Sequence, residues 1–151
     1  MNDEMYMRLA IELSEKSQYP YGAVIVMDGK IIGRSDTKVP IADTAISHAE
    51  LRAIEDAMEE MGGHLCAEGG HGATIYSSCE PCAMCMGAIL YTGISRLVYG
   101  ATLEDSAECV NDILASSEDV ANACHNRTIE IVPEFMRSEA KEVLNKWKEK
   151  R

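Results

Sequence analysis

The sequence predicts an α/β fold, a three-layer α-β-α sandwich in which a five-stranded mixed sheet carries helices on both faces. Two observations predict it. Strand-like and helix-like segments alternate along most of the chain, and the first helical pattern is followed by a hairpin pattern. The 151 residues, 46% of them hydrophobic, are enough for one core, so we expect a single domain over residues 1–151.

The expected elements begin with an amphipathic helix at residues 3–17, where apolar side chains recur at helical spacing among charges. Two apolar stretches follow at 23–27 and 31–33, and Asp28-Gly29 separates them. Because Asp-Gly accepts the positive φ angles of a tight turn, these stretches predict a β-hairpin.

Residues 36–47 contain turn residues without sustained periodicity, so we expect a loop that leads into the next helix. That helix, at about 47–61, has Ser47 as its expected N-cap and Glu50 three positions later, which is the capping-box pattern. The remaining expected elements are a strand at 73–77, a helix from Pro81 to about residue 91, a strand at 96–100, a helix at 103–115, a strand at 128–132 and a helix at 138–150.

The charge balance is strongly acidic, with 14 Lys+Arg against 25 Asp+Glu and a formal net charge of -11. Residues 137–151 hold six basic and three acidic groups, so the remaining 136 residues carry a net charge of -14. Proteins that bind the phosphate backbone of nucleic acids depend on Lys and Arg to displace counterions. The composition therefore argues against nucleic-acid binding as the main function.

The six cysteines suit a reducing compartment better than a secreted disulfide scaffold. No apolar run approaches the ~20 residues that span a bilayer, and the N-terminal residues carry acids where a secretory signal would carry Lys or Arg. Three cysteines crowd together at 79, 82 and 85. We therefore expect a cytoplasmic protein without a membrane partner, whose clustered cysteines bind metal or perform redox chemistry.

Two short motifs carry the chemistry: HAE at 48–50 and PCAMC at 81–85. Both lie at expected helix N-termini, whose exposed N–H groups and positive dipole end favour thiolate over thiol. The His48 imidazole and the Cys82 and Cys85 thiolates make three zinc ligands. Three protein ligands with the fourth position left to water is the catalytic form of a zinc site.

Glu50 adds a candidate catalytic group to these ligands. It follows the histidine by two residues in the first turn of the expected helix, so its carboxylate can lie beside the metal without ligating it. In that position it could take a proton from the metal's water and pass it to a leaving group.

Other readings of the cysteines stay open at this point. A lone Cys-x-x-Cys also suits a thiol-redox protein or half of a zinc ribbon. The run Cys79-x2-Cys82-x2-Cys85 also suits the start of an iron–sulfur motif, although Ile89 stands where the fourth ferredoxin cysteine would be. A non-catalytic zinc-binding or thiol-redox protein is thus the alternative from another functional class.

The pattern H-x-E followed by P-C-x-x-C is the signature of zinc-dependent nucleobase deaminases. The sequence resembles the cytidine deaminase superfamily over about residues 5–105, in YPYGAVIVMDGKIIGRS, SHAELRAIEDA and ATIYSSCEPCAMCMGAILYTGISRLVYGAT. The stretch EPCAMCMGAI at 80–89 is similar to the branch that holds guanine deaminases, yeast-type cytosine deaminase and tRNA adenosine deaminases.

This resemblance implies a cytidine deaminase-like fold and a hydrolase that replaces an amino group on a nucleobase or nucleoside with oxygen. It assigns His48, Cys82 and Cys85 as ligands of Zn2+ and Glu50 as the catalytic proton shuttle. The backbone N–H groups of Ala49 and Cys82 would line the substrate site. Since relatives of this kind form dimers or higher oligomers, we expect a homodimer or a higher homo-oligomer.

The resemblance also suggests substrate contacts. The stretch LEDSAE at 103–108 is similar to guanine deaminases, in which an Asp near this point reads the purine edge, and Asp105 is the matching residue. Tyr21 matches an often aromatic position and either stacks on a base or simply packs, while Thr37 stands where relatives carry a substrate-contacting Asn. Guanine is the first substrate expected, and adenosine in a tRNA anticodon is the alternative. The acidic body favours a small base or nucleoside.

Overall fold

The computed structural model describes residues 2–37, 44–61, 72–107, 109 and 113–150. One five-stranded sheet has the order β2-β1-β3-β4-β5. Its strands are β1 (Ala23–Met27), β2 (Lys30–Arg34), β3 (Thr74–Cys79), β4 (Arg96–Ala101) and β5 (Glu130–Val132). Strand β1 pairs antiparallel with β2 and β3, whereas β3, β4 and β5 run parallel, so the sheet is mixed as predicted.

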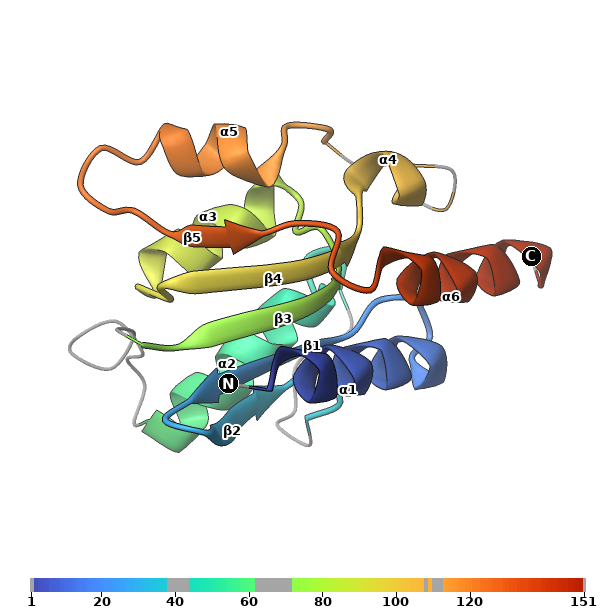
Figure 1. Ribbon diagram of the computed structural model, residues 1–151, viewed down its shortest axis with the longest axis horizontal. Helices are drawn as coiled ribbons and strands as arrows, with labels where there is room; N and C mark the ends of the chain where they lie inside the picture. The colour runs from blue at the N-terminus through green and yellow to red at the C-terminus, as the bar shows by residue number, and fades with distance from the viewer. Residues whose placement is uncertain (1, 38–43, 62–71, 108, 110–112, 151) are drawn as a thin grey trace.

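Helices cover both faces of this sheet (Figure 1). The helices are α1 (Asp3–Lys16), α2 (Ala49–Met61), α3 (Ala83–Tyr91), α4 (Leu103–Ser106), α5 (Ser117–Asn122) and α6 (Arg137–Glu149). One core cluster joins the sheet to α2, α3 and α5, and a second joins its other face to α1 and α6. The predicted three-layer sandwich is confirmed, and no described helix is long and apolar enough to cross a membrane.

The hairpin forms where the sequence predicts it. Asp28 and Gly29 both adopt positive φ angles, 52° and 74°, in the turn between β1 and β2. Such angles match the right-handed twist of the two strands, which explains why Asp-Gly occurs here.

The predicted helix at 103–115 is wrong, because α4 ends at Ser106 and a separate helix, α5, begins at Ser117. The backbone closes α4 with tight-turn bonds, in which the Ala107 N–H donates to Glu104 and the Cys109 N–H donates to Ser106. This turn allows Cys109 to be buried against α6. The missed start of α5 does have a local signal, since the Ser116 hydroxyl accepts from the Asp119 N–H at 3.0 Å.

The topology brings the chemical motifs to one edge of the sheet. Strands β3 and β4 are parallel, so their carboxyl ends lie together, and α3 and α4 start there. In open α/β sheets ligands bind outside the carboxyl ends of the strands. The functional site is therefore expected at this edge.

Candidate active site

A cavity of about 610 Å³ lies at this edge. Its volume falls within the range of small-molecule sites. The predicted residues that line it are Tyr21, His48, Ala49, Glu50 and Cys82, and the other lining residues are Ser17, Gln18, Tyr19, Ser35, Thr44, Ala45, Ser47, Arg52, Cys79 and Glu80.

The three predicted metal ligands lie together. His48 directly precedes α2, Cys82 is the N-cap of α3 and Cys85 lies in the first turn of α3. Their ligand atoms all lie within 4.8 Å of one another, and Cys82 Sγ is 3.6 Å from His48 Nδ1. Two helix starts that are more than thirty residues apart in sequence thus supply one cluster.

The spacing of these atoms fits a zinc ion. With Zn–S near 2.3 Å and Zn–N near 2.0–2.1 Å, neighbouring ligands of a tetrahedral ion lie roughly 3.4–3.8 Å apart. The separation between Cys82 and His48 has this value. Among the residues that the structure describes, these three therefore fit a metal site with three protein ligands.

The pKa values of the two cysteine thiols are shifted in opposite directions. The pKa of Cys82 is lowered to about 4, chiefly because the Cys85 thiol donates a hydrogen bond to it and secondarily because of His48. The pKa of Cys85 is raised by the same contact, by burial and by the nearby Glu50 charge. One thiolate thus forms readily beside His48, and the second is the group that a cation would stabilise.

Glu50 occupies the first turn of α2, one residue after Ala49. It is 6% exposed and lines the cavity. Its contact with the Cys85 thiol places the carboxylate at the cysteine pair. A buried carboxylate beside three metal ligands can exchange protons with a group bound in the cavity.

The start of α2 lies two residues after the expected cap, Ser47. The helix begins at Ala49, so His48 and not Ser47 precedes it. The Ser47 hydroxyl accepts a hydrogen bond from the Thr44 N–H at 3.1 Å. This contact folds the preceding loop onto the helix start and leaves His48 at the position from which its ring reaches Cys82.

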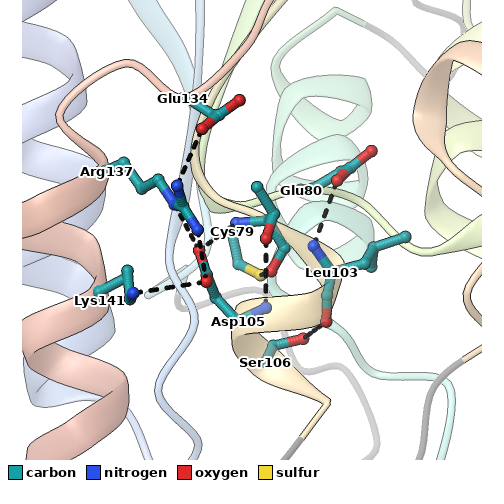
Figure 2. A network of polar contacts seen from close by, with 9 residues as sticks. Cys79, Glu80, Leu103, Asp105, Ser106, Glu134, Arg137 and Lys141 are labelled. Carbon is teal, nitrogen blue, oxygen red and sulfur yellow. Dashed lines mark hydrogen bonds and ion pairs between the residues drawn. The ribbon is translucent and has the colours of Figure 1, made fainter.

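Two other predicted substrate contacts have different partners. The Thr37 hydroxyl donates to Asp56 on α2. The Asp105 carboxylate accepts from the Thr102 N–H and from Arg137 Nε and Nη2, each at 2.9 Å, and Lys141 lies 3.7 Å away (Figure 2). Neither is among the described residues that line the cavity. Their substrate roles rest on the resemblance and stay predictions.

Sequence reasoning missed Glu80. The residue is 7% exposed and lines the cavity, and its carboxylate accepts hydrogen bonds from the starts of α4 and α5. A signal was present, because an acidic residue directly between a buried strand and Pro81 has to find partners inside the fold.

The C-terminal helix meets the rim of the cavity through Trp147. Trp147 on α6 donates its indole N–H to the Gln18 carbonyl at 3.1 Å, and its ring lies 6.1 Å from that of Tyr19. Gln18 and Tyr19 line the cavity. The last helix therefore supports the rim of the cavity from outside.

Comparison with known proteins agrees with this geometry. Residues 1–101 match the family described as the cytidine and deoxycytidylate deaminase zinc-binding region. A tRNA-specific adenosine deaminase of Bacillus subtilis is 37% identical over 66% of this chain and 62% of its own length. A guanine deaminase of the same organism is 32% identical over 85% of this chain and 83% of its own.

Solved structures share the fold. The structure of a guanine deaminase from Nitrosomonas europaea superposes with a TM-score of 0.79 at 24% identity, covering 95% of this chain and 83% of that one. A tRNA:A34 deaminase structure has a TM-score of 0.72 at 30% identity, covering 93% of this chain and 99% of that one.

Proposed function

The chain belongs to the cytidine and deoxycytidylate deaminase zinc-binding family, and on that basis we propose that it is a zinc-dependent hydrolase that deaminates a nucleobase or nucleoside. The observation that carries the proposal is the cluster of His48, Cys82 and Cys85 with the buried Glu50 beside it, at one cavity. A structural zinc site closes its coordination with a fourth protein ligand and needs no neighbouring carboxylate.

His48, Cys82 and Cys85 would hold the metal. Zinc bound there supplies Lewis acidity, which makes water a nucleophile near pH 7. Glu50 accepts the first proton of the attacking water and delivers it to a ring nitrogen, then accepts the proton of the new hydroxyl on the carbon and delivers it to the departing amine. The carbon exchanges its amino group for oxygen, and the products are the oxo base and ammonia.

The cavity wall supplies the remaining contacts of the proposal. Ala49, at the first position of α2, and Cys82, at the N-cap of α3, have backbone N–H groups at helix starts that can donate to a polar substrate edge. Tyr21 offers an aromatic ring at the same cavity. We propose both backbone groups and this ring as substrate contacts.

Guanine is the substrate that we propose first. Support comes from the LEDSAE stretch and from a guanine deaminase that is 32% identical over 85% of this chain. If Asp105 reads the purine edge, it must exchange its contacts with Arg137 and Lys141 for the base. The D105N variant tests this role, because a base-reading carboxylate predicts a KM change for guanine that exceeds the change for other bases.

Deamination of adenosine in tRNA is the second candidate, supported by the 37% identity to the Bacillus subtilis tRNA enzyme. The charge distribution argues against this candidate. The C-terminal segment carries the excess of basic groups, yet Arg137 and Lys141 face Asp105, and Lys146 lies 3.5 Å from Glu142. Such pairing weakens the attraction of this helix for phosphates.

An ultraviolet assay of the zinc-loaded protein against guanine, guanosine, cytosine, cytidine and adenine tests the proposal. We expect the largest rate with guanine, and an inosine assay on tRNA tests the second candidate in parallel. Turnover of none of these substrates, or metal-free protein with a Cys82–Cys85 disulfide, would contradict the proposal and favour a thiol-redox protein. Light scattering tests the accompanying proposal of a homo-oligomer.

A further inference from the structure

The buried carboxylate of Glu80 collects hydrogen bonds from two helices. Its Oε1 accepts from the Leu103 N–H at 3.2 Å, and its Oε2 accepts from the N–H and hydroxyl of Ser117 at 2.9 and 2.8 Å. The Glu80 backbone N–H donates to the Ala101 carbonyl at 2.7 Å. The residue is therefore fixed at both its main chain and its side chain.

The donors are the first residues of α4 and α5. The N–H groups at a helix start have no partner within the helix, and a carboxylate is favoured there by the dipole. Glu80 lies 23 residues before Leu103 and 37 residues before Ser117 in sequence. One carboxylate thus holds two remote helix starts against the end of β3.

These helix starts form part of the surroundings of the cysteines. Leu103 is 2% exposed and packs in one apolar cluster with Cys82 and Cys85, which are 8% and 0% exposed. On α5, Val120 and Ala121 pack in the same cluster as residues of α3, the helix that carries Cys85. Movement of the α4 start would loosen the packing around the two thiols, and movement of α5 would loosen the packing on α3.

Only Pro81 separates Glu80 from Cys82, so the anchored residue and the first cysteine are joined by a linker with a fixed φ angle. A displacement of Glu80 would therefore also displace Cys82. In Figure 2 the Glu80 side chain points at the start of α4, while Asp105 ties that same short helix to Arg137 and Lys141 of α6.

We propose that Glu80 is a positioning residue, which sets the spacing of Cys82 and Cys85 for metal by holding α4 over them and α5 against α3. The inference rests on the proposed zinc site. The carboxylate acts through Cys82 and Leu103, and it takes no part in the proton transfers.

The substitution Glu80→Gln tests this role, because the amide keeps the shape and removes one acceptor. One of the donors from Leu103 and Ser117 then faces an NH2 group and loses its partner. Partners outside the ligand shell typically change metal affinity by about 10–100-fold. We expect at least a tenfold loss of zinc affinity, measured by chelator competition, and an altered visible spectrum of the cobalt-loaded protein.

Matched controls are available on the same two helices. Glu104→Gln and Glu118→Gln make the same charge change at exposed first-turn positions of α4 and α5. We expect both to keep the parent affinity and spectrum. Ser117→Ala removes only the hydroxyl donor, so we expect it to lose less zinc affinity than Glu80→Gln does. Its fold should stay close to that of the parent, as checked by circular dichroism.

A second measurement reads the positioning without metal. In the metal-free protein we expect Glu80→Gln to make Cys82 and Cys85 react several-fold faster with a thiol reagent. Mass spectrometry scores the rate for each cysteine, and Glu118→Gln should leave both rates unchanged.

Parent-like zinc affinity and thiol reactivity in Glu80→Gln would overturn the inference. A Glu80→Gln protein in which KM rises and nothing else changes would also overturn it. If the parent protein itself binds no zinc, the proposed function fails. In that case the thiol measurement still tests the positioning role, and equal thiol rates in the parent and in Glu80→Gln would reject it.

Discussion

The two ends of the parallel strands hold polar clusters of opposite character. At the amino end, Arg96 of β4 is paired with Asp3 at 2.7 Å and Glu130 at 3.0 Å, and the Tyr76 hydroxyl donates to Asp3. Each charge there meets an opposite charge. At the carboxyl end, by contrast, two cysteines, a histidine and buried carboxylates gather around one cavity.

This contrast distinguishes a structural cluster from a functional one. An ion pair that is internally balanced mainly holds elements together, here α1 against β4 and β5. At the carboxyl end, the contact with Cys82, burial and the Glu50 charge together raise the pKa of Cys85, so that its thiolate needs a cation to stabilise it. We therefore expect substitutions at the amino end to change stability and those at the carboxyl end to change activity.

The largest expected effect belongs to Cys82→Ala. Removal of this ligand leaves two protein ligands, so we expect less than one zinc per chain by metal analysis and a loss of deaminase activity on the order of a thousandfold or more. Cys124→Ala is the matched control, since Cys124 lies outside the cluster and is partly exposed. Full zinc content in Cys82→Ala would contradict the assigned ligand set.

Asp3→Ala tests the other end of the strands. The variant loses the bonds to Arg96 and Tyr76, in a place where the two charged side chains are only 18% and 22% exposed. We expect the free energy of unfolding to fall by about 2 kcal/mol in a urea titration, with kcat/KM within about twofold of the parent. Loss of activity in a well-folded Asp3→Ala protein would remove the proposed division between the two ends.

The difference in the free energy of unfolding between the parent and Asp3→Ala should depend on pH. The pKa of Asp3 is lowered, chiefly by the hydrogen bonds from Arg96. A lowered folded-state pKa contributes stability that is complete above the unfolded value, about 3.9, and is lost as the pH falls through the folded value. The difference between parent and Asp3→Ala should therefore be largest near pH 7 and shrink towards pH 3. Glu4→Ala, at an exposed ion pair with Arg8, is the control and should change the free energy of unfolding very little at pH 7.

The smallest effect is expected at the rim of the cavity. Trp147→Phe keeps an aromatic ring beside Tyr19 and removes the N–H that holds the Gln18 carbonyl. We expect KM to rise by about threefold with kcat unchanged, because one exposed hydrogen bond is lost and the reacting groups stay in place. A fall in kcat without a change in KM would show that α6 reaches the chemistry itself.

Local signals account for what the sequence predicted. The Asp-Gly turn, the ligands at helix starts and Glu50 each depend on residues within one turn or one motif, and the structure brings the ligand trio together. Contacts between remote elements could not be predicted this way. Asp105 meets Arg137 across 32 residues and Glu80 meets Ser117 across 37, and the turn that closes α4 places Cys109 against α6. Periodicity within 103–115 carries no information about those partners.

The most direct test of the catalytic cluster is ammonia release by Glu50→Gln at matched zinc content. Glu50 is not one of the three proposed ligands, so the variant should still bind one zinc per chain. Its rate of ammonia release from the parent's best substrate should fall by about 10²–10⁴-fold, since the proton shuttle is gone. A zinc-loaded Glu50→Gln protein that releases ammonia at the parent rate would contradict the account.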